Sequence, residues 1–238
     1  MGNVAVVVGA SGGIGGALVD ALLASGRFDE VHALSRRPCR ERAHLRTHLA
    51  DVTDEASLAR AAAAIGATGE VRLAIVASGL LHAEGIAPEK AMRALDPAAM
   101  AAVFAVNAIG PALVAKHVVP LLPRRGRSVF AALSARVGSI GDNHLGGWYA
   151  YRASKAALNQ LVRTLSIELA RTRPEAIALA LHPGTVATAL SRPFRADAAA
   201  AGLFDPAEAA ARLLAVIDAA TPAESGAVLA HDGSRIPY

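Results

Sequence analysis

Tyr151 and Lys155 stand four residues apart in the run YRASK and are the residues best suited to chemistry in this chain. Side chains at this spacing share one face of a helix. A free tyrosine has a pKa of about 10, and a nearby ammonium group favours its phenolate form. With a second cation present, lowering that pKa to about 7 needs roughly 4 kcal/mol. The pair therefore indicates a general acid or base, although exposed helices often carry the same spacing without any chemical role.

A glycine-rich turn, G-A-S-G-G-I-G, follows the first apolar stretch and opens a helix-like segment. Small residues there allow a tight turn, close approach of the backbone to a pyrophosphate, and close packing of helix on strand. The helix N-terminus adds amide donors and the positive end of its dipole. In this position the pattern predicts dinucleotide binding by Gly9, Ser11, Gly12, Gly13, Ile14 and Gly15.

The end of the second apolar run indicates which dinucleotide binds. An NAD site usually has an acidic residue about 20 positions after the glycines. Here that position holds Ser35, and Arg36 and Arg37 follow it. A guanidinium suits a 2′-phosphate, so the sequence predicts NADP(H). The missing carboxylate also disfavours an S-adenosylmethionine methyltransferase, because those enzymes share a glycine loop but usually keep an acidic residue at this position.

A further polar position, Asp51-Val52, follows the third apolar run. A carboxylate there is able to accept a hydrogen bond from the adenine amino group. Asp51, Thr53 and Asp54 all suit the start of the next helix as capping residues. Asp54 fits that position more naturally, which leaves Asp51 for the adenine.

Apolar strands alternate with helical segments along the chain, which predicts an α/β doubly wound, mostly parallel seven-stranded sheet (a Rossmann fold) in one domain, residues 1–238. The expected strands are Val4–Val8, Glu30–Leu34, Arg46–Leu49, Val71–Ala77, Arg127–Leu133, Ile177–Leu181 and Ala227–Ala230. The expected helices are Gly13–Ser25, Glu55–Ile65, Pro97–Leu122, Tyr149–Arg171 and Pro206–Ala220. The carboxyl ends of parallel strands, where such folds bind ligands, would bring the polar motifs together.

The composition narrows the class of protein. With 53% hydrophobic and 18% charged residues, the chain has the material for one large core. The net charge of +4 comes from scattered arginines without a basic stripe, so nucleic-acid binding is not expected. The single cysteine, Cys39, fits a reducing compartment, and the N-terminus indicates neither a signal peptide nor a membrane span, so a cytoplasmic location is expected. His44 and His48 have no third ligand nearby, so no metal site is expected.

Taken together, these motifs resemble those of the short-chain dehydrogenase/reductase superfamily, of the compact single-domain kind. They include the glycine turn, D-V after the third strand, Asn107 in FAVNAIGP, YxxxK, and P-G-T-V-A-T at Pro183–Thr188, in the family order over essentially the whole chain. The segment GSIGDNHLGGWYAYRASKAALNQ and the tail DGSRIPY are similar to the C-factor and sniffer-like carbonyl reductases.

This resemblance implies roles for individual residues. Tyr151 would protonate a carbonyl oxygen while NADPH delivers a hydride, and Lys155 would lower the Tyr151 pKa and bind the nicotinamide ribose. Asn107 would organise a water in a proton relay. The nicotinamide carboxamide would be contacted by Pro183, Gly184, Val186 through its backbone and Thr188 through its hydroxyl.

The chain departs from the family pattern in two places. The usual N-N-A-G after the fourth strand reads V-A-S-G, so Ala77, Ser78 and Gly79 keep only the small size needed beside the cofactor. The second of two adjacent serines, which would bind the substrate carbonyl, is Ala135. Three alternatives remain for the group that binds the carbonyl, and Ser139 is favoured. Ser134 is the second, but we expect it to face the core because neighbouring side chains on a strand point opposite ways. The third is that no serine binds the carbonyl. Ser139 also suits a simple turn-forming role.

The leading functional hypothesis is an NADP(H)-dependent enzyme that reduces a small ketone or aldehyde, or oxidises the alcohol. The alternative is a non-catalytic NADP-binding regulatory or signalling protein, but such proteins commonly lose the tyrosine or the lysine. A sugar-nucleotide epimerase needs a larger C-terminal domain than the 50 residues after Thr188 provide. We expect a homodimer or homotetramer built on the two long helices, Pro97–Leu122 and Tyr149–Arg171. Ser191–Asp205 is expected to form a mobile substrate lid. Trp148 and Tyr149 are expected to be packing residues or part of the pocket wall.

Overall fold

A seven-stranded parallel sheet forms the centre of the computed structural model, which describes residues 2–40, 42–194 and 202–238. The strand order is β3-β2-β1-β4-β5-β6-β9. The strands are β1 (Gly2–Val8), β2 (Glu30–Ser35), β3 (Leu45–Leu49), β4 (Gly69–Val76), β5 (Ser128–Leu133), β6 (Ala176–His182) and β9 (Val228–Ala230). Central strands such as β5 are buried at every position, because helices cover both faces of the sheet. The predicted fold class is confirmed.

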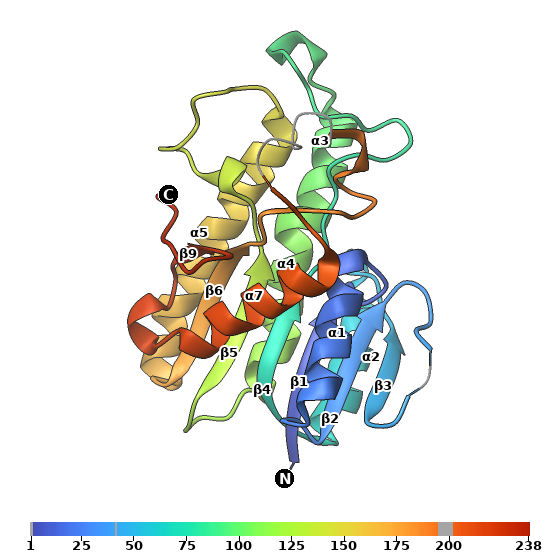
Figure 1. Ribbon diagram of the computed structural model, residues 1–238, viewed down its shortest axis with the longest axis vertical. Helices are drawn as coiled ribbons and strands as arrows, with labels where there is room; N and C mark the ends of the chain where they lie inside the picture. Colours follow the sequence, from blue (N-terminus) through green and yellow to red (C-terminus); the bar gives the residue numbers. More distant parts are fainter. Residues whose placement is uncertain (1, 41, 195–201) are drawn as a thin grey trace.

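Helices lie on both faces of the sheet (Figure 1). On one face, α1 (Gly13–Ser25) and α7 (Pro206–Ala219) bury Leu18, Leu22 and Leu213 against the strands. On the other face, α2 (Glu55–Gly66), α4 (Gly110–Val118) and α5 (Tyr149–Thr172) bury Leu58, Val114 and Leu158. The helices begin and end within two residues of the predicted positions, except in the run that follows α3 (Pro97–Phe104).

This run, predicted as one helix over Pro97–Leu122, is divided into four parts. A π-helical turn, η2 (Ala105–Ile109), separates α3 from α4, and a 3₁₀ turn, η3 (Val119–Leu121), ends it. Pro111 has no N–H to give the carbonyl of Asn107, which interrupts the α-helical pattern at this point. Pro97–Leu121 is long and apolar enough to cross a membrane by length and composition alone, since the mean hydropathy of its most apolar 18 residues is 1.9. In the fold, Val114 and Val118 of this run pack against the sheet, as in the core helix of a globular protein.

Short elements that the sequence pattern did not predict lie mainly at the carboxyl edge of the sheet. Strands β7 (Thr185–Val186) and β8 (Leu203–Phe204) form a separate two-stranded sheet. The 3₁₀ turns are η1 (Met92–Ala94), η4 (Arg136–Gly138), η5 (Arg192–Phe194) and η6 (Pro222–Glu224).

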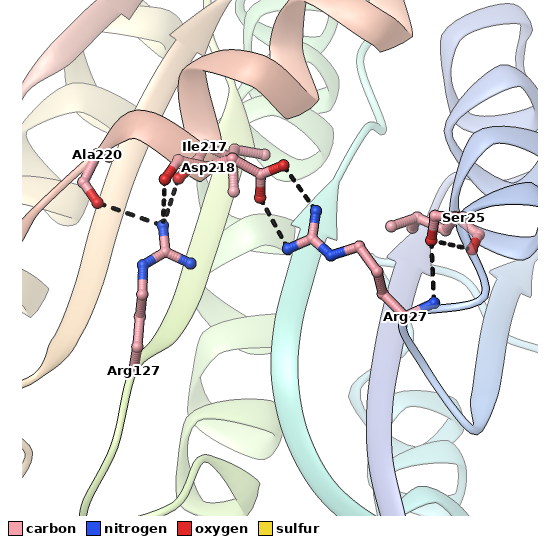
Figure 2. A network of polar contacts seen from close by, with 7 residues as sticks. Ser25, Arg27, Arg127, Ile217, Asp218 and Ala220 are labelled. Carbon is pink, nitrogen blue, oxygen red and sulfur yellow. Dashed lines mark hydrogen bonds and ion pairs between the residues drawn. The ribbon is translucent and has the colours of Figure 1, made fainter.

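A polar network fastens α7 at the opposite, amino edge of the sheet (Figure 2). Arg27, which follows α1, forms a two-pronged ion pair with Asp218 at 2.6 and 2.9 Å. Arg127, which precedes β5, donates to the carbonyl oxygens of Ile217, Asp218 and Ala220. A guanidinium at the carboxyl end of a helix satisfies carbonyls that have no helical partner and complements the dipole. This network fixes the end of α7 on the sheet.

Candidate active site

The glycine turn packs directly on the segment that follows β4. Gly9 has a φ of 85°, which favours glycine, and a Cβ atom there would lie 2.8 Å from the Ser78 amide nitrogen. A Cβ atom on Gly15 would overlap the carbonyl oxygen of Gly9. The backbone therefore has no room for a side chain at Gly9 or Gly15, and α1 begins at Gly13 with its first amides directed at the turn.

Ala77, Ser78 and Gly79 connect the glycine turn to Lys155. Ala77 donates its N–H to the Val8 carbonyl at 2.8 Å, and the buried Ser78 hydroxyl oxygen has no hydrogen-bond partner among the described residues. A Cβ atom on Gly79 would lie 4.0 Å from the Lys155 Nζ atom. The V-A-S-G segment thus lies between the predicted phosphate turn and the predicted reacting lysine.

The P-G-T-V-A-T segment also reaches the glycine turn. A Cβ atom on Gly13 would lie 2.8 Å from the Thr188 Cγ2 atom. The Val186 carbonyl accepts a hydrogen bond from the Ser191 hydroxyl at 2.5 Å, and β8 pairs with β7 beside it. The predicted lid at Ser191–Asp205 falls partly outside the described residues, since 195–201 are not among them.

The predicted 2′-phosphate residues end β2. The Ser35 hydroxyl donates to the Arg37 carbonyl, which holds the backbone in a turn. The side chains of Arg36 and Arg37 are exposed, as an incoming phosphate would require. This geometry fits a phosphate site.

Asp51, the predicted adenine contact, already forms hydrogen bonds with a nearby residue. Asp54 caps α2 by accepting from the Ala56 amide at 3.1 Å, as predicted. One carboxylate oxygen of Asp51 accepts from the Thr53 amide at 2.9 Å and from the Thr53 hydroxyl at 2.8 Å. These bonds, with the charge of Arg36, lower the pKa of Asp51. Asp51 is therefore part of a turn as well as a candidate adenine contact. Val52 packs beside the π turn, because a Cβ atom on Gly110 would lie 2.8 Å from the Val52 Cβ atom.

Tyr151 and Lys155 lie in the first turns of α5 and are both buried. The Lys155 ammonium donates to the Leu133 carbonyl at 2.8 Å and lies 5.8 Å from the centre of the Tyr151 ring. Burial raises the pKa of Tyr151 to about 12 and lowers the pKa of Lys155 to about 8. The protein alone therefore moves the pKa of Tyr151 further above 7, opposite to the direction expected from the lysine, because burial disfavours the charged phenolate.

Asn107 lies in the π turn, and its carboxamide is fully hydrogen-bonded within the protein. Its Nδ2 atom donates to the Leu80 carbonyl at 2.8 Å and to the Ser154 hydroxyl at 3.1 Å. Its Oδ1 atom accepts from the Leu80 amide at 2.7 Å. The Ser154 hydroxyl donates in turn to the Tyr151 carbonyl at 2.8 Å. Asn107 thus joins the loop after β4 to the backbone of the reacting tyrosine.

The two candidate serines have different partners. The Ser134 hydroxyl donates to the Asn159 Oδ1 atom at 2.7 Å, so this serine faces α5 in the core, as predicted. The Ser139 hydroxyl oxygen accepts from the Asp142 amide at 3.1 Å, the bond of a turn-forming serine. That bond does not use the hydroxyl hydrogen of Ser139, a residue that is only 2% exposed. A Cβ atom on the preceding Gly138 would lie 2.7 Å from the Lys155 Cβ atom, which puts this loop against the face of α5 that carries Lys155.

Sequence reasoning missed a set of contacts at the start of α5. Trp148 precedes the helix with a φ of 52°, and its ring lies edge-on to the Tyr151 ring at 6.2 Å. Its amide donates to the Glu89 carbonyl at 2.5 Å, and the Glu89 carboxylate accepts from the Ala150 amide at 3.2 Å. Glu89 lies in an irregular segment without a motif, so nothing in its sequence surroundings marks it.

The histidines do not gather around a metal position within the described parts of the chain. His48 pairs with the buried His32 on neighbouring strands, Nε2 to Nδ1, at 2.8 Å. The His32 Nε2 atom lies 3.1 Å from the Thr68 hydroxyl, which itself donates to the Ile65 carbonyl. Burial, followed by the charge of His48, lowers the pKa of His32 to about 4. The pair is a neutral hydrogen-bonded link between strands.

Comparison with known proteins adds to this geometry. Residues 3–199 match the family model described as short chain dehydrogenase. The C-signal protein of Myxococcus xanthus is 39% identical over 146 residues, 60% of this chain and 81% of that protein. A 1-hydroxy-2-glutathionyl-2-methyl-3-butene dehydrogenase of a Rhodococcus species is 34% identical, over 79% of this chain and 78% of the relative. The structure of an NADPH-bound carbonyl reductase from chicken fatty liver superimposes with a TM-score of 0.85 at 28% identity, covering 99% of this chain and 98% of that one.

Proposed function

Because the chain belongs to the short-chain dehydrogenase family of oxidoreductases, we propose that it uses NADP(H) to reduce the carbonyl of a ketone or aldehyde, or to run the reverse oxidation. The observation that carries the proposal is the burial of Tyr151 beside Lys155, next to the glycine turn, at the carboxyl edge of the sheet. The NADPH-bound carbonyl reductase with the same fold supports the choice of cofactor and reaction. The single cysteine is in keeping with a cytoplasmic enzyme.

The residues of this site fit a bound NADP(H), which supplies or accepts the hydride. Gly9 and Gly15 allow the turn to pack closely at the start of α1, whose N-terminal amides suit a pyrophosphate, and the unpartnered Ser78 hydroxyl offers a polar contact beside it. Arg36 is the residue we assign to the 2′-phosphate. Lys155 would bind the nicotinamide ribose in place of its present bond to the Leu133 carbonyl. At the nicotinamide, the Val186 carbonyl is already engaged, so a backbone contact there falls to the Val186 N–H.

The raised pKa of Tyr151 suits a general acid in reduction. At neutral pH the phenol is protonated, so Tyr151 is able to give its proton to the carbonyl oxygen as the hydride reaches the carbonyl carbon. The resulting phenolate takes a proton back from solvent, and the Lys155 ammonium stabilises it meanwhile. The Ser139 hydroxyl hydrogen, which the Asp142 bond does not use, is assigned to the carbonyl oxygen. We assign Asn107 to the proton path through the bonds that fix it against Leu80 and Ser154.

The test is an NADPH-oxidation screen over carbonyl compounds, from small diketones to bulky aromatic ketones, with three proteins. The wild type should oxidise NADPH with at least one substrate, Tyr151→Phe should lose this activity, and Tyr149→Phe is the matched control that should keep it. NADPH binding without turnover over the whole panel would favour the regulatory alternative. Equal rates for wild type and Tyr151→Phe would refute the mechanism.

We also propose that the chain forms a symmetric homodimer, or a tetramer built from it, through the outer faces of α4 and α5. A groove of about 430 Å³ lies between these helices, lined by residues that include Pro111, Ala115, Val119, Leu161 and Leu165. Leu161 is 41% exposed and Ile167 on the same helix is 46% exposed, so pairing would bury apolar surface. Light scattering at micromolar concentration should give twice or four times the mass of 24.2 kDa. A monomeric mass would contradict the proposal.

A further inference from the structure

We propose that Glu89 and Arg152 are positioning residues, which clamp the turn before α5 and hold Trp148 as a fixed wall beside Tyr151. The kinetic part of this inference rests on the proposed function, and its spectroscopic part does not. The elements involved are the irregular segment between β4 and α3, which carries Glu89, and the first turn of α5, which carries Arg152.

The turn before α5 has an unusual backbone. Gly146, Gly147 and Trp148 follow one another with φ values of 64°, 65° and 52°, all in the left-handed region. Glycine adopts this region readily, whereas a bulky residue is strained there. Trp148 is also the N-cap position of α5, and its side chain makes no cap bond to the first amides. The turn therefore needs outside partners both to hold the strained residue and to satisfy the start of the helix.

Glu89 provides the acceptors for these amides. Its carbonyl oxygen accepts from the Trp148 amide at 2.5 Å, and its carboxylate accepts from the Ala150 amide at 3.2 Å. The side chain is only 7% exposed, so the carboxylate lies in the interior at the positive end of the α5 dipole. Glu89 thus replaces the missing cap from a distant part of the chain and fixes the residues on both sides of Tyr149.

Arg152 provides the donors for the carbonyls of the same turn. Its Nε atom donates to the Gly147 carbonyl at 3.0 Å and to the Gly146 carbonyl at 3.2 Å. Its Nη1 atom donates to the Val137 carbonyl at 3.2 Å, two residues before Ser139. One guanidinium therefore joins the candidate serine loop to the turn, and it does so from the residue next to Tyr151 in the chain.

The consequence of the clamp is a fixed aromatic pair. The Trp148 and Tyr151 rings meet edge-on at 6.2 Å, so a rotation of the turn moves the indole relative to the phenol. Because Trp148 is strained, losing the Glu89 carboxylate would release the Ala150 amide at the start of α5 and leave only the main-chain bond to hold Trp148 in the left-handed region. The site would then lose the wall that orients a carbonyl toward the Tyr151 hydroxyl. NADPH contacts at the glycine turn lie on other elements and would be unaffected.

The experiment uses the only tryptophan of the chain as its reporter, since Trp148 alone gives the tryptophan signal. Glu89→Ala should weaken the near-ultraviolet circular dichroism of Trp148 and raise its quenching by acrylamide at least twofold. It should also lower kcat for carbonyl reduction at least tenfold while changing the KM for NADPH less than twofold. Glu89→Gln keeps an acceptor oxygen and should restore most of both signals. Glu84→Ala, an exposed glutamate in the same segment, is the matched control and should match the wild type.

The outcomes separate this inference from the proposed function. The Trp148 spectra are measured without cofactor or substrate, so they test the clamp even if no carbonyl compound is reduced. A folded Glu89→Ala protein with a wild-type Trp148 spectrum and kcat would overturn the proposal, and so would a lowered melting temperature as its only change. If Glu89→Ala does not fold, Arg152→Lys takes its place. This variant keeps the charge but loses the three-way donor geometry, and it should show the same spectral change and kcat loss. An unaltered spectrum and kcat in Arg152→Lys would then refute the clamp.

Discussion

Loss of the Lys155 charge should set the alkaline limit of activity. Burial lowers the pKa of this lysine from 10.5 to about 8, which corresponds to a cost of about 3 kcal/mol for keeping the ammonium charged inside the protein. Below about pH 8 the ammonium is charged and able to hold the nicotinamide ribose and stabilise the Tyr151 phenolate. Above that pH the charged fraction falls tenfold for each pH unit. We therefore expect the reduction rate to decline in the same proportion.

The assay is kcat/KM for NADPH between pH 6 and pH 10, because this ratio reports the ionisation of the free enzyme. The expected profile is level up to about pH 8 and falls roughly tenfold by pH 9. Lys155→Arg, whose guanidinium stays charged over this range, should keep whatever activity it retains with no alkaline fall below pH 10. A wild-type profile that stays level to pH 10, or a variant with the same fall as the wild type, would refute the reasoning.

Three further predictions concern single residues. NADPH should bind at least tenfold more tightly than NADH, about 1.4 kcal/mol, and Arg36→Ala should remove most of this preference; equal affinities of the wild-type protein by calorimetry would contradict it. Ser139→Ala should lower kcat about a hundredfold or more with NADPH binding intact, whereas Ser134→Ala should lose its bond to Asn159 and mainly reduce stability, by about 1 kcal/mol in urea unfolding. Because the pKa of His32 is about 4 in the fold and 6.5 as a free side chain, its contribution to stability is present above pH 6.5 and is lost as the pH falls toward 4. Urea unfolding at pH 7 and pH 4.5 should show a loss of about 2 kcal/mol from this residue, which His32→Gln should remove.

Much of the fold could be predicted because its signals are local. The strands are continuous apolar runs with both faces buried, and α1 begins and ends at the predicted Gly13 and Ser25 because a glycine turn and Gly26 bound it. The position of the polar motifs at one edge followed from the parallel order of the strands. The π turn at Asn107 did not follow from hydrophobic periodicity, although Pro111 carried a signal for it.

The rest of the site depends on contacts between distant segments. Glu89 has a partner only because α5 begins beside it, and its carbonyl accepts from the amide of Trp148, whose backbone is left-handed. The pKa of Tyr151 illustrates the same limit for electrostatics. Sequence spacing gave the neighbouring charge of Lys155, but the extent of burial, which dominates the pKa, comes from the whole fold.

The fastening of α7 at the amino edge has a consequence for protein engineering. Arg27 and Arg127 hold the last turn of this helix, and Asp205 caps its first turn by accepting from the Glu208 amide at 2.7 Å. The segment that connects β7 to α7 contributes anchors of its own, because Asp205 caps α7 and Leu203–Phe204 pair with β7. A segment taken from a relative would therefore have to keep a capping residue at position 205 and the pairing of β8, whereas the bonds of Arg27 and Arg127 at the amino edge would stay intact. Engineering of this connection by segment exchange thus calls for a replacement that ends in the same strand and cap, without a matching repair of the core.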